Sequence, residues 1–402
     1  MHPEAIAVVA VGFLLFGVFS QAARGSFLTG PLLFAAFGLL AGPSGLGWVR
    51  LSMAEGFLHT LAEATLILVL FADAATVDLK VLRRDHKLPT RLLLVGMPLT
   101  ILFTAGAAAL FFPGLSLWEA ALVGVLLAPT DAALGQAVVT SSAVPLRIRT
   151  ALSVESGLND GIALPLVLIF ASLAFPPMAG GGGQSWGTFA AAQVTLGPLA
   201  GALVGYLGAR AVDRASANGW MAAQAEGIVA LALAFLAFAF AELIHGNGFI
   251  AAFVAGLIFG NTLRKRCEFL YEFAEAEGLI LILTTFFVFG SSMLPQALGH
   301  VTLVVVAFGL LCLTVLRMVP VGLALLGTGV GFKKGAFLGW FGPRGLATIL
   351  FVLLIVEELE MAGRESIVTA AVTTVALSIL LHGITSGPLS RRFGASETGP
   401  AS

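Results

Sequence analysis

Apolar stretches of about 20 residues follow one another along almost the whole chain, separated by short polar connections. A helix needs roughly 20 mostly apolar residues to cross a bilayer, and only helices and closed barrels satisfy their backbone there. The short segments of alternating polarity that a barrel requires are not found in this sequence. Of its 402 residues, 58% are hydrophobic and 11% are charged, whereas soluble proteins carry about 25% charged residues. The sequence therefore predicts an all-α polytopic membrane protein.

Hydropathy and the short connections divide the chain into thirteen predicted spans. The first resembles a secretory signal peptide, but such a peptide begins with basic residues, whereas this stretch carries Glu4. We therefore interpret it as a transmembrane helix. The spans lie near residues 4–21, 28–46, 57–78, 92–112, 117–140, 148–174, 188–209, 226–244, 247–263, 277–295, 300–325, 334–356 and 366–387.

Basic residues fall almost entirely in every second connection between these spans. The connections after odd-numbered spans contain 17 of the 21 Lys and Arg residues, whereas the opposite side receives only Arg50 and Arg364. Connections rich in Lys and Arg stay in the cytoplasm, so we expect the N-terminus outside and the C-terminus in the cytoplasm. A count wrong by one span would destroy this bias, which therefore supports thirteen.

The order of the spans suggests an internal symmetry. Six spans that begin outside, one linker span and six spans that begin inside make an inverted repeat. We expect a single transmembrane transporter domain over residues 1–402. Its parts are a first repeat at about 1–187, a linker helix at about 188–225, a second repeat at about 226–390 and a short cytoplasmic tail at 391–402.

The fifth and twelfth spans, which correspond in the two repeats, are each interrupted by proline near the centre. The fifth contains APTDAALG, with Pro129, Thr130 and Asp131, and the twelfth contains FGPRGLAT, with Pro343 and Arg344. Proline removes a backbone donor and frees a carbonyl. Unpaired backbone at that depth persists only where it is buried in protein or lines a cavity. Paired interruptions of this kind indicate a transport site.

The sixth span carries polar and charged side chains in the sequence ESGLNDG, residues 155–161. A charge at the bilayer centre costs about 3 kcal/mol on insertion scales, so each one requires a reason. Ser156 and Asp160 are four residues apart and share one helical face, and we interpret Asp160 as an ion-binding residue. We expect Glu155 to form a buried salt bridge with Arg344, because a buried carboxylate requires a partner.

The roles of three other charged residues within the spans stay open at this point. Asp131 either orients the broken helices or joins the ion's ligands. Asp73 acts either behind the ligands or in a cytoplasmic funnel. Arg317 is either a salt-bridge partner or a counter-charge at the binding site.

Oxygen atoms near the two breaks suit a hard monovalent cation. Asp160, Ser156 and a freed carbonyl near Thr130 are the ligand types that Na⁺ or Li⁺ prefers. A desolvated carboxylate holds either a proton or such a cation, and not both. Competition of two cations for one carboxylate, combined with alternating access, is the minimal chemistry of an exchanger.

Five motifs together resemble the cation:proton antiporter-1 family, which includes bacterial sodium/proton antiporters and animal sodium/proton exchangers. The resemblance covers almost the whole chain, and the combination of motifs is far more specific than each alone. The motifs are ESGLNDG (155–161), APTDAALG (128–135), GNGFIAAFVAGLIFGN (246–261), FGPRGLATILF (341–351) and HGITSGPL (382–389).

The resemblance implies a homodimer in the inner membrane, in which a six-helix core slides like an elevator relative to an interface domain. It implies electroneutral exchange of Na⁺ or Li⁺ for H⁺, with no cofactor and no enzymatic activity. Asp160 would carry the cation and the proton in turn. The surrounding oxygens would come from Asp131, Thr130, Ser156 and Asp73, with Na⁺ at Asp160, Ser156, Asp131 and Thr130.

The resemblance also implies roles for the neighbours of Asp160. Glu155 and Arg344 would form the stabilising salt bridge. Asn159 stands where electrogenic relatives have a second aspartate, and an asparagine carries no proton, so one-for-one exchange is implied. Some relatives have a glutamate at the position of Asp73, and the shorter side chain makes direct coordination by Asp73 an open question.

Alternative functions differ in what they would require of the sequence. K⁺/H⁺ exchange in the same family is the nearest alternative, because selectivity depends on small differences in cavity geometry. A cation channel is more distant, because pore rings are not evident. An intramembrane aspartyl protease would need a Gly-x-Gly-Asp motif, which the sequence lacks. Cys267 and Cys312 are far apart and predict neither a disulfide nor a metal cluster.

Overall fold

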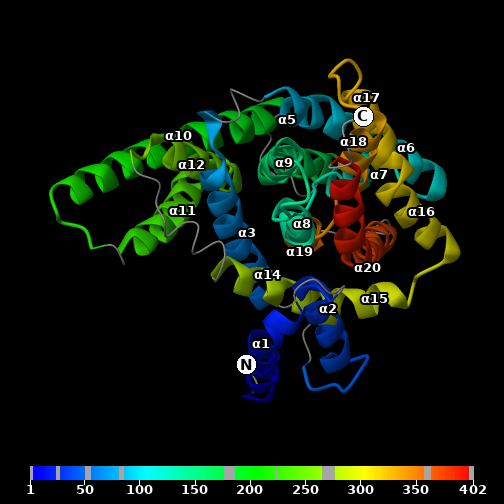
Figure 1. Cartoon of the computed structure of the whole chain (residues 1–402). Helices are drawn as coiled ribbons and strands as arrows, with labels where there is room; N and C mark the ends of the chain where they lie inside the picture. Colours follow the sequence, from blue (N-terminus) through cyan, green and yellow to red (C-terminus); the bar gives the residue numbers. More distant parts are fainter. Residues whose placement is uncertain are drawn as a thin grey trace. The chain divides into compact units, whose positions relative to one another are not determined.

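The computed structural model is helical throughout the part of the chain that it describes, with no strand there (Figure 1). The described residues are 3–23, 28–49, 56–80, 86–175, 186–222, 225–264, 277–356 and 364–397. Arg50 and Cys267, both considered above, lie outside these residues.

Among the described residues, eight helical segments are long and apolar enough to cross a membrane, judged by length and composition. Five shorter apolar helices lie on the remaining predicted spans, so each of the thirteen spans contains an apolar helix. Whether all five shorter helices cross the membrane stays a prediction. The long segments are α3 (Gly56–Thr76), Lys87–Phe111, α9 (Leu146–Ala174), α10 (Trp186–Ala217), α11 (Ala225–Leu243), Gly278–Leu298, Leu303–Ala324 and α20 (Arg364–Glu397). The shorter apolar helices are Ile6–Ser20 within α1 (Pro3–Ala23), α2 (Gly30–Ala41), α7 (Leu117–Leu126), α12 (Gly248–Thr262) and α19 (Leu346–Val356).

Two of the long segments contain a π-helical turn directly before a proline. In the first, η1 (Leu92–Gly96) separates α5 (Lys87–Arg91) from α6 (Met97–Phe111), which has Pro98 in its first turn. In the second, η3 (Phe289–Met293) separates α14 (Glu277–Val288) from α15 (Leu294–Leu298), which has Pro295 in its first turn. A proline ring clashes with the carbonyl one turn earlier, and a wider π turn accommodates that ring within a continuous helix.

The contacts divide the chain into two compact units, each of which combines segments from both halves of the sequence. Unit 1 contains Met1–Thr60, Lys87–Ser156 and Ile282–Ser402, and unit 2 contains Leu61–His86 and Gly157–Leu281. Helix α9 is continuous across the boundary, so its first part belongs to unit 1 and its second part to unit 2.

Close packing at small residues holds α12 between two other helices of unit 2. A Cβ added at Gly201 of α10 would collide with the Ala251 carbonyl oxygen of α12. A Cβ added at Gly256, elsewhere on α12, would collide with the Phe71 carbonyl oxygen of α3. Membrane helices approach closely where small residues face one another, because van der Waals packing is then at its densest. Helix α12 therefore packs closely against the backbones of both α10 and α3.

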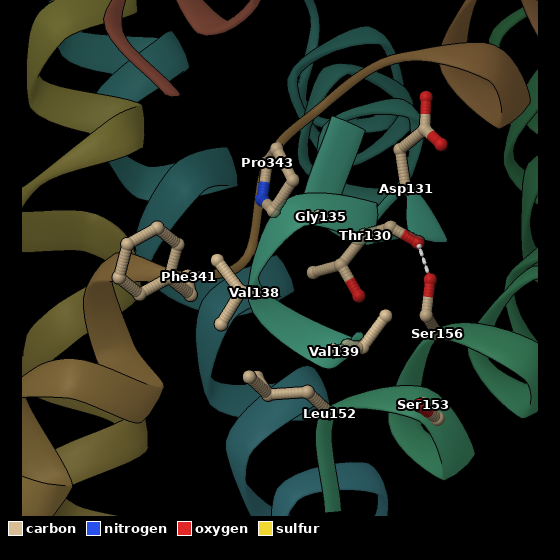
Figure 2. Close-up of a pocket in the computed structure, with 10 residues that line it drawn as sticks. All are labelled: Thr130, Asp131, Gly135, Val138, Val139, Leu152, Ser153, Ser156, Phe341 and Pro343. Carbon is tan, nitrogen blue, oxygen red and sulfur yellow. Dashed lines mark hydrogen bonds between the residues drawn. The ribbon is translucent and has the colours of Figure 1, made fainter. Parts of the chain in front are cut away.

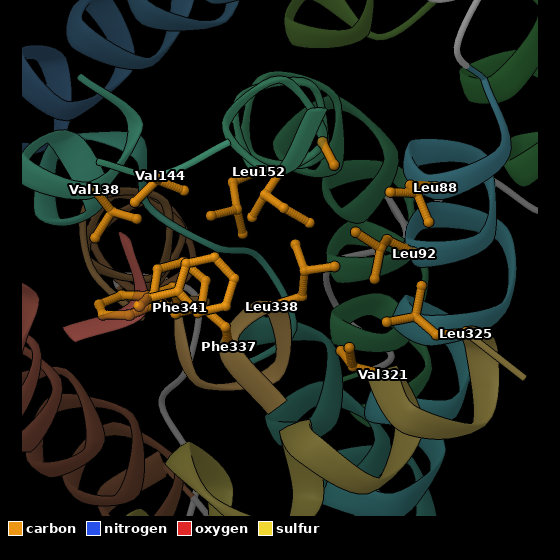
Figure 3. Close-up of a cluster of buried hydrophobic side chains, with 13 residues drawn as sticks. Leu88, Leu92, Val138, Val144, Leu152, Val321, Leu325, Phe337, Leu338 and Phe341 are labelled. Atoms are coloured by element: carbon orange, nitrogen blue, oxygen red, sulfur yellow. The ribbon is translucent and has the colours of Figure 1, made fainter. Parts of the chain in front are cut away.

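A hydrophobic cluster joins the helices of unit 1 at one end (Figure 3). The Phe337 ring lies with its centroid 4.5 Å from that of Phe341 and 4.1 Å from that of Phe393. Basic residues such as Lys87 and Arg391 directly precede or follow segments of the cluster, so this is the end expected in the cytoplasm. The cluster comprises Leu88, Leu92, Val138, Val144, Ile148, Ala151, Leu152, Val321, Leu325, Phe337, Leu338, Phe341 and Phe393.

Candidate ion-binding site

Both predicted helix interruptions are confirmed, and both lie in unit 1. Residues 127–131 separate α7 from α8 (Ala132–Val139), and residues 341–345 separate α18 (Phe332–Trp340) from α19. A broken helix leaves backbone N–H groups and carbonyls without partners in the helix itself. The side chains of the breaks therefore decide how these groups are satisfied.

The carboxylate of Asp131 caps the N-termini of two helices. Its Oδ1 atom accepts hydrogen bonds from the backbone N–H groups of Ala133 at 2.7 Å and Leu134 at 3.4 Å in α8. Its Oδ2 atom accepts from the backbone N–H of Leu346 in α19 at 2.7 Å, and its own N–H donates to the Pro343 carbonyl at 2.8 Å. Helix N-termini carry partial positive charge, so one carboxylate stabilises both. Asp131 therefore orients the broken helices, which is one of the two roles left open by the sequence.

Gly345 allows this double cap, and the sequence reasoning missed it. A Cβ added at Gly345 would overlap Asp131 Oδ2 and would lie 2.7 Å from Leu134 Cδ1. Only glycine leaves room for the carboxylate to reach the first amide of α19. The glycine on each side of Pro343-Arg344 was the signal that could have indicated this close approach.

Arg344 and Thr348 satisfy the C-terminal end of α7. Arg344 Nη1 donates to the carbonyls of Ala128, at very short range, and of Pro129, at 2.9 Å. The Thr348 hydroxyl donates to the Leu126 carbonyl at 2.8 Å. These carbonyls lack helical donors because the chain leaves the helix here. Arg344 of the second break and Thr348 of α19 thus stabilise the first break.

Glu155 pairs with Arg317, and the predicted pairing of Glu155 with Arg344 is wrong. Glu155 Oε1 lies 2.5 Å from Arg317 Nη2, with the two side chains 2% and 1% exposed. Arg317 lies in the first turn of α17 (Val315–Ala324), and Glu155 lies on α9. The physical reason is that the Arg344 guanidinium donates to the carbonyls of the first break. Arg317, for which a salt bridge was one of two open roles, is the partner.

A small cavity lies beside the first break, entirely within unit 1 (Figure 2). Its volume of about 20 Å³ is enough for about one water-sized occupant. Its polar lining residues are Thr130, Asp131, Ser153 and Ser156, and its apolar ones include Val138, Leu152 and Phe341. The sequence reasoning did not single out Ser153, although it lies three residues before Ser156 on the same helical face.

Thr130 and Ser156 form the polar corner of this cavity. The Ser156 hydroxyl donates to the Thr130 backbone carbonyl at 2.6 Å, which is a carbonyl freed by the break, as expected. Figure 2 shows the Asp131 carboxylate pointing away from Ser156, consistent with its use as a cap. The structure therefore brings Thr130 and Ser156 together and turns the Asp131 oxygens toward helix ends.

The other predicted site residues lie in unit 2. Asp160 is one helical turn beyond Ser156 on continuous α9 and is half-buried, whereas Asn159 is buried. Asp73, in α3, is half-buried. A Cβ added at Gly157 would lie 3.7 Å from the Asp73 carbonyl oxygen, so α3 packs on α9 within unit 2 close to Asp160 in the chain.

The oxygen atoms of these residues are of the types that hard cations prefer. Among the described residues, no group of three or more His, Cys, Asp or Glu side chains could hold a metal ion. Hydroxyl, carbonyl and carboxylate oxygens along α9 and the first break suit alkali cations rather than transition metals.

Comparison with known families decides to which one the chain belongs. The family described as "Sodium/hydrogen exchanger, transmembrane" matches residues 6–392. The chain belongs to this family. It is a family of transmembrane transporters and not of enzymes, in agreement with the resemblance seen in the sequence.

A solved structure agrees with the fold of this exchanger family member. The sodium proton antiporter MjNhaP1 from Methanocaldococcus jannaschii superimposes with a TM-score of 0.80, covering 98% of this chain and 97% of that one. The two sequences are 17% identical, so this likeness shows the fold alone.

Relatives of this exchanger family member carry names that specify two cations. The Na(+)/H(+) antiporter NhaP of Pseudomonas aeruginosa is 29% identical over 85% of this chain and 82% of its own length. The Na(+)/H(+) antiporter 2 of Zygosaccharomyces rouxii is 28% identical over 82% of this chain. The K(+)/H(+) antiporter NhaP of Alkalimonas amylolytica is 24% identical over 80% of this chain. The matches span 43% of the length of the Zygosaccharomyces relative, 41% of a Schizosaccharomyces pombe relative and 55% of the Alkalimonas relative.

Proposed function

We propose that the chain is a secondary active antiporter that exchanges a monovalent cation, Na⁺ or Li⁺, for a proton. The observation that carries the proposal is the pair of broken helices whose ends are satisfied by Asp131 and Arg344, beside a small cavity lined by Ser156. Discontinuous helices with satisfied ends are the architecture in which transporters bind ions. Relatives named as Na⁺/H⁺ antiporters support the same function.

In the proposed cycle, Asp160 binds the cation and the proton in turn. The Thr130 carbonyl and the Ser156 hydroxyl are proposed as neutral oxygen ligands, and Asp73 is proposed as a further carboxylate. Asp131 contributes its negative charge and the position of the Thr130 carbonyl, because its oxygens accept hydrogen bonds from three backbone N–H groups. Asp160 binds either the cation or the proton, and never both. Because the site changes sides of the membrane only when one of them is bound, the two fluxes are coupled.

The proposed stoichiometry is one proton for each cation. Asn159 is buried next to Asp160 in the chain, and an amide has no proton to exchange in this pH range. Asp160 is therefore the only proposed proton carrier of the ESGLNDG segment, and the exchange is electroneutral.

The proposed assembly is an inner-membrane homodimer of thirteen spans with elevator-type alternating access. The inverted repeats over about 1–187 and 226–390, the linker helix and the cytoplasmic tail are part of this proposal. The apolar helices on all thirteen predicted spans and the fold shared with MjNhaP1 support it. The basic residues around the hydrophobic cluster support a cytoplasmic C-terminus.

Exchange of K⁺ for H⁺ is the second candidate, and relatives from Alkalimonas amylolytica and Shewanella oneidensis that are named K(+)/H(+) antiporters favour it. A cation channel is the more distant alternative.

Proteoliposomes that contain a pH-sensitive dye distinguish these functions when Na⁺, Li⁺ and K⁺ are added separately at a series of pH values. Dequenching with Na⁺ and Li⁺ is the expected result, and dequenching with K⁺ alone would replace the first candidate by the second. Unitary currents in a planar bilayer would contradict both exchangers.

A further inference from the structure

The sequence HGITSGPL, residues 382–389, has no role in the proposed exchange, yet its histidine is deeply buried in unit 1. His382 lies on α20 and is 1% exposed. Its Nε2 atom lies 2.9 Å from the carbonyl oxygen of Trp340, which is the last residue of α18. The histidine therefore contacts the helix end at which the second break begins.

The contact with Trp340 places a proton on one ring nitrogen of His382. A carbonyl oxygen only accepts, so Nε2 must carry the proton that it donates to Trp340. The Ser378 hydroxyl accepts the backbone N–H of Arg344 at 2.7 Å and lies 3.2 Å from His382 Nδ1. His382 Nδ1 has two partners within reach, this hydroxyl and the Ser378 carbonyl oxygen at 3.0 Å. In the neutral Nε2–H tautomer, Nδ1 accepts the hydroxyl proton. The neutral Nε2–H tautomer thus completes a chain from Arg344 through Ser378 and His382 to Trp340.

This chain connects the start of the second break with its centre. The Trp340 carbonyl lies at a helix C-terminus, where intrahelical donors are lacking, and a histidine N–H is a suitable cap. It also accepts the Gly342 N–H at 2.9 Å. Between Trp340 and Arg344 lie Phe341 and Pro343, which line the cavity. One turn of α20 therefore fixes the backbone that forms one wall of the ion site.

Two arginines of unit 1 act on His382 electrostatically, Arg344 from the break and Arg317 from α17. The nearby carboxylates are occupied, since Glu155 from α9 pairs with Arg317 and Asp131 accepts backbone N–H groups. A proton on Nδ1 would turn this atom into a donor toward the Ser378 carbonyl at 3.0 Å and would leave the Ser378 hydroxyl without its acceptor. It would also add a third positive charge to a buried cluster.

We propose that His382 is a positioning residue of the exchanger, which holds the second broken helix in the geometry of the ion site as the neutral Nε2–H tautomer. The transport part of this inference rests on the proposed exchange. Its structural part, the local stability of residues 341–346, does not.

Two substitutions of the histidine separate its two ring nitrogens. His382→Gln places an amide N–H near the position of Nε2, whereas His382→Asn places an amide near Nδ1. Thr385→Val is the matched control, because Thr385 on the same helix accepts the Trp340 indole N–H at 3.1 Å and donates to the Leu381 carbonyl. Each variant is purified as the full chain, and its melting temperature is measured. Hydrogen–deuterium exchange is then followed for the peptide that contains residues 341–346, and the pH profile of dye dequenching is recorded in proteoliposomes.

We expect His382→Asn to raise the exchange rate of the break amides roughly tenfold, as for the loss of a hydrogen bond to a buried carbonyl. It should slow transport at every pH, whereas His382→Gln and Thr385→Val retain protection and transport close to those of the unchanged chain. Equal behaviour of His382→Gln and His382→Asn would overturn the inference, as would a shifted pH profile in His382→Gln, because that would show titration of the histidine. If the unchanged chain moved none of the three cations, the proposed function would fail, and the amide protection would still decide the role of His382.

Discussion

Glu155 Oε1 and Arg317 Nη2 lie 2.5 Å apart, and both side chains are almost completely buried. This ion pair connects α9, which carries Ser156 and Asp160, to α17 at its first turn. Arg344, the other buried arginine among the described residues of unit 1, donates to carbonyls of the first break instead. The two arginines therefore have different roles. Arg317 forms an ion pair with helix α9, and Arg344 stabilises the region where the two broken helices meet.

Removing Glu155 should destabilise the protein strongly. Breaking a buried pair on one side costs about 3–5 kcal/mol, because an uncompensated charge stays behind. We expect Glu155→Ala to lower the melting temperature in detergent and Glu155→Leu combined with Arg317→Met to restore much of the loss. A better recovery when Glu155→Leu is combined with Arg344→Met would show that Arg344 is the partner.

Replacing Asp131 should loosen both broken helices at once. Loss of one N-cap costs about 0.5–2 kcal/mol, and Asp131 caps α8 and α19. Asp131→Ala should therefore lower the free energy of unfolding by about 1–4 kcal/mol, and Asp131→Asn, which keeps one acceptor oxygen, by less. Chemical denaturation in detergent measures both values. An unchanged stability of Asp131→Ala would mean that the caps are dispensable.

A single methyl group at Gly345 should disturb the same double cap. Its Cβ would overlap Asp131 Oδ2, and overpacking of this kind costs typically about 1–3 kcal/mol. Gly106→Ala in α6 is the control, because a Cβ there meets nothing within 4 Å and alanine stabilises a helix interior by about 0.5–1 kcal/mol. We therefore expect Gly345→Ala to lower the melting temperature and Gly106→Ala to raise it. A shift of both melting temperatures in the same direction would contradict the close approach at Gly345.

Asp160→Asn should abolish exchange and leave the protein folded. The amide neither binds a proton in this range nor offers a full negative charge to a cation. The measurement is dye dequenching in proteoliposomes, with the melting temperature as the control for folding. Addition of Na⁺ should raise the melting temperature of the unchanged chain and not that of the variant, because a ligand stabilises only the state that binds it. Retained transport would remove Asp160 as the carrier.

Electroneutral exchange should be insensitive to membrane voltage. We expect the same dequenching rate in proteoliposomes with and without an imposed potential, because one cation leaves for each proton that enters. Asn159→Asp adds a second ionisable group beside Asp160 in the chain, and its transport, where retained, should respond to voltage. A voltage response of the unchanged chain would contradict the one-for-one stoichiometry.

The sequence alone was sufficient for features that depend on consecutive residues. The thirteen apolar segments follow from hydropathy. Both helix breaks were predicted from Pro129 and Pro343 at the centres of two corresponding spans, whereas Pro165 and Pro198 lie within continuous helices. The shared face of Ser156 and Asp160 follows from the period of a continuous helix. The freed carbonyl near Thr130 was likewise expected from the break and is the one that accepts from Ser156.

Only the tertiary structure decided which distant groups meet. Glu155 had two buried arginines available, and the packing of α17 against α9 selected Arg317. Asp131 became a cap for α19 because Leu346 and Gly345 lie against it, and His382 met Trp340 across a separation of 42 residues. Such pairings depend on how helices pack, and spacing along one helix says which side chains share a face but not what that face will touch.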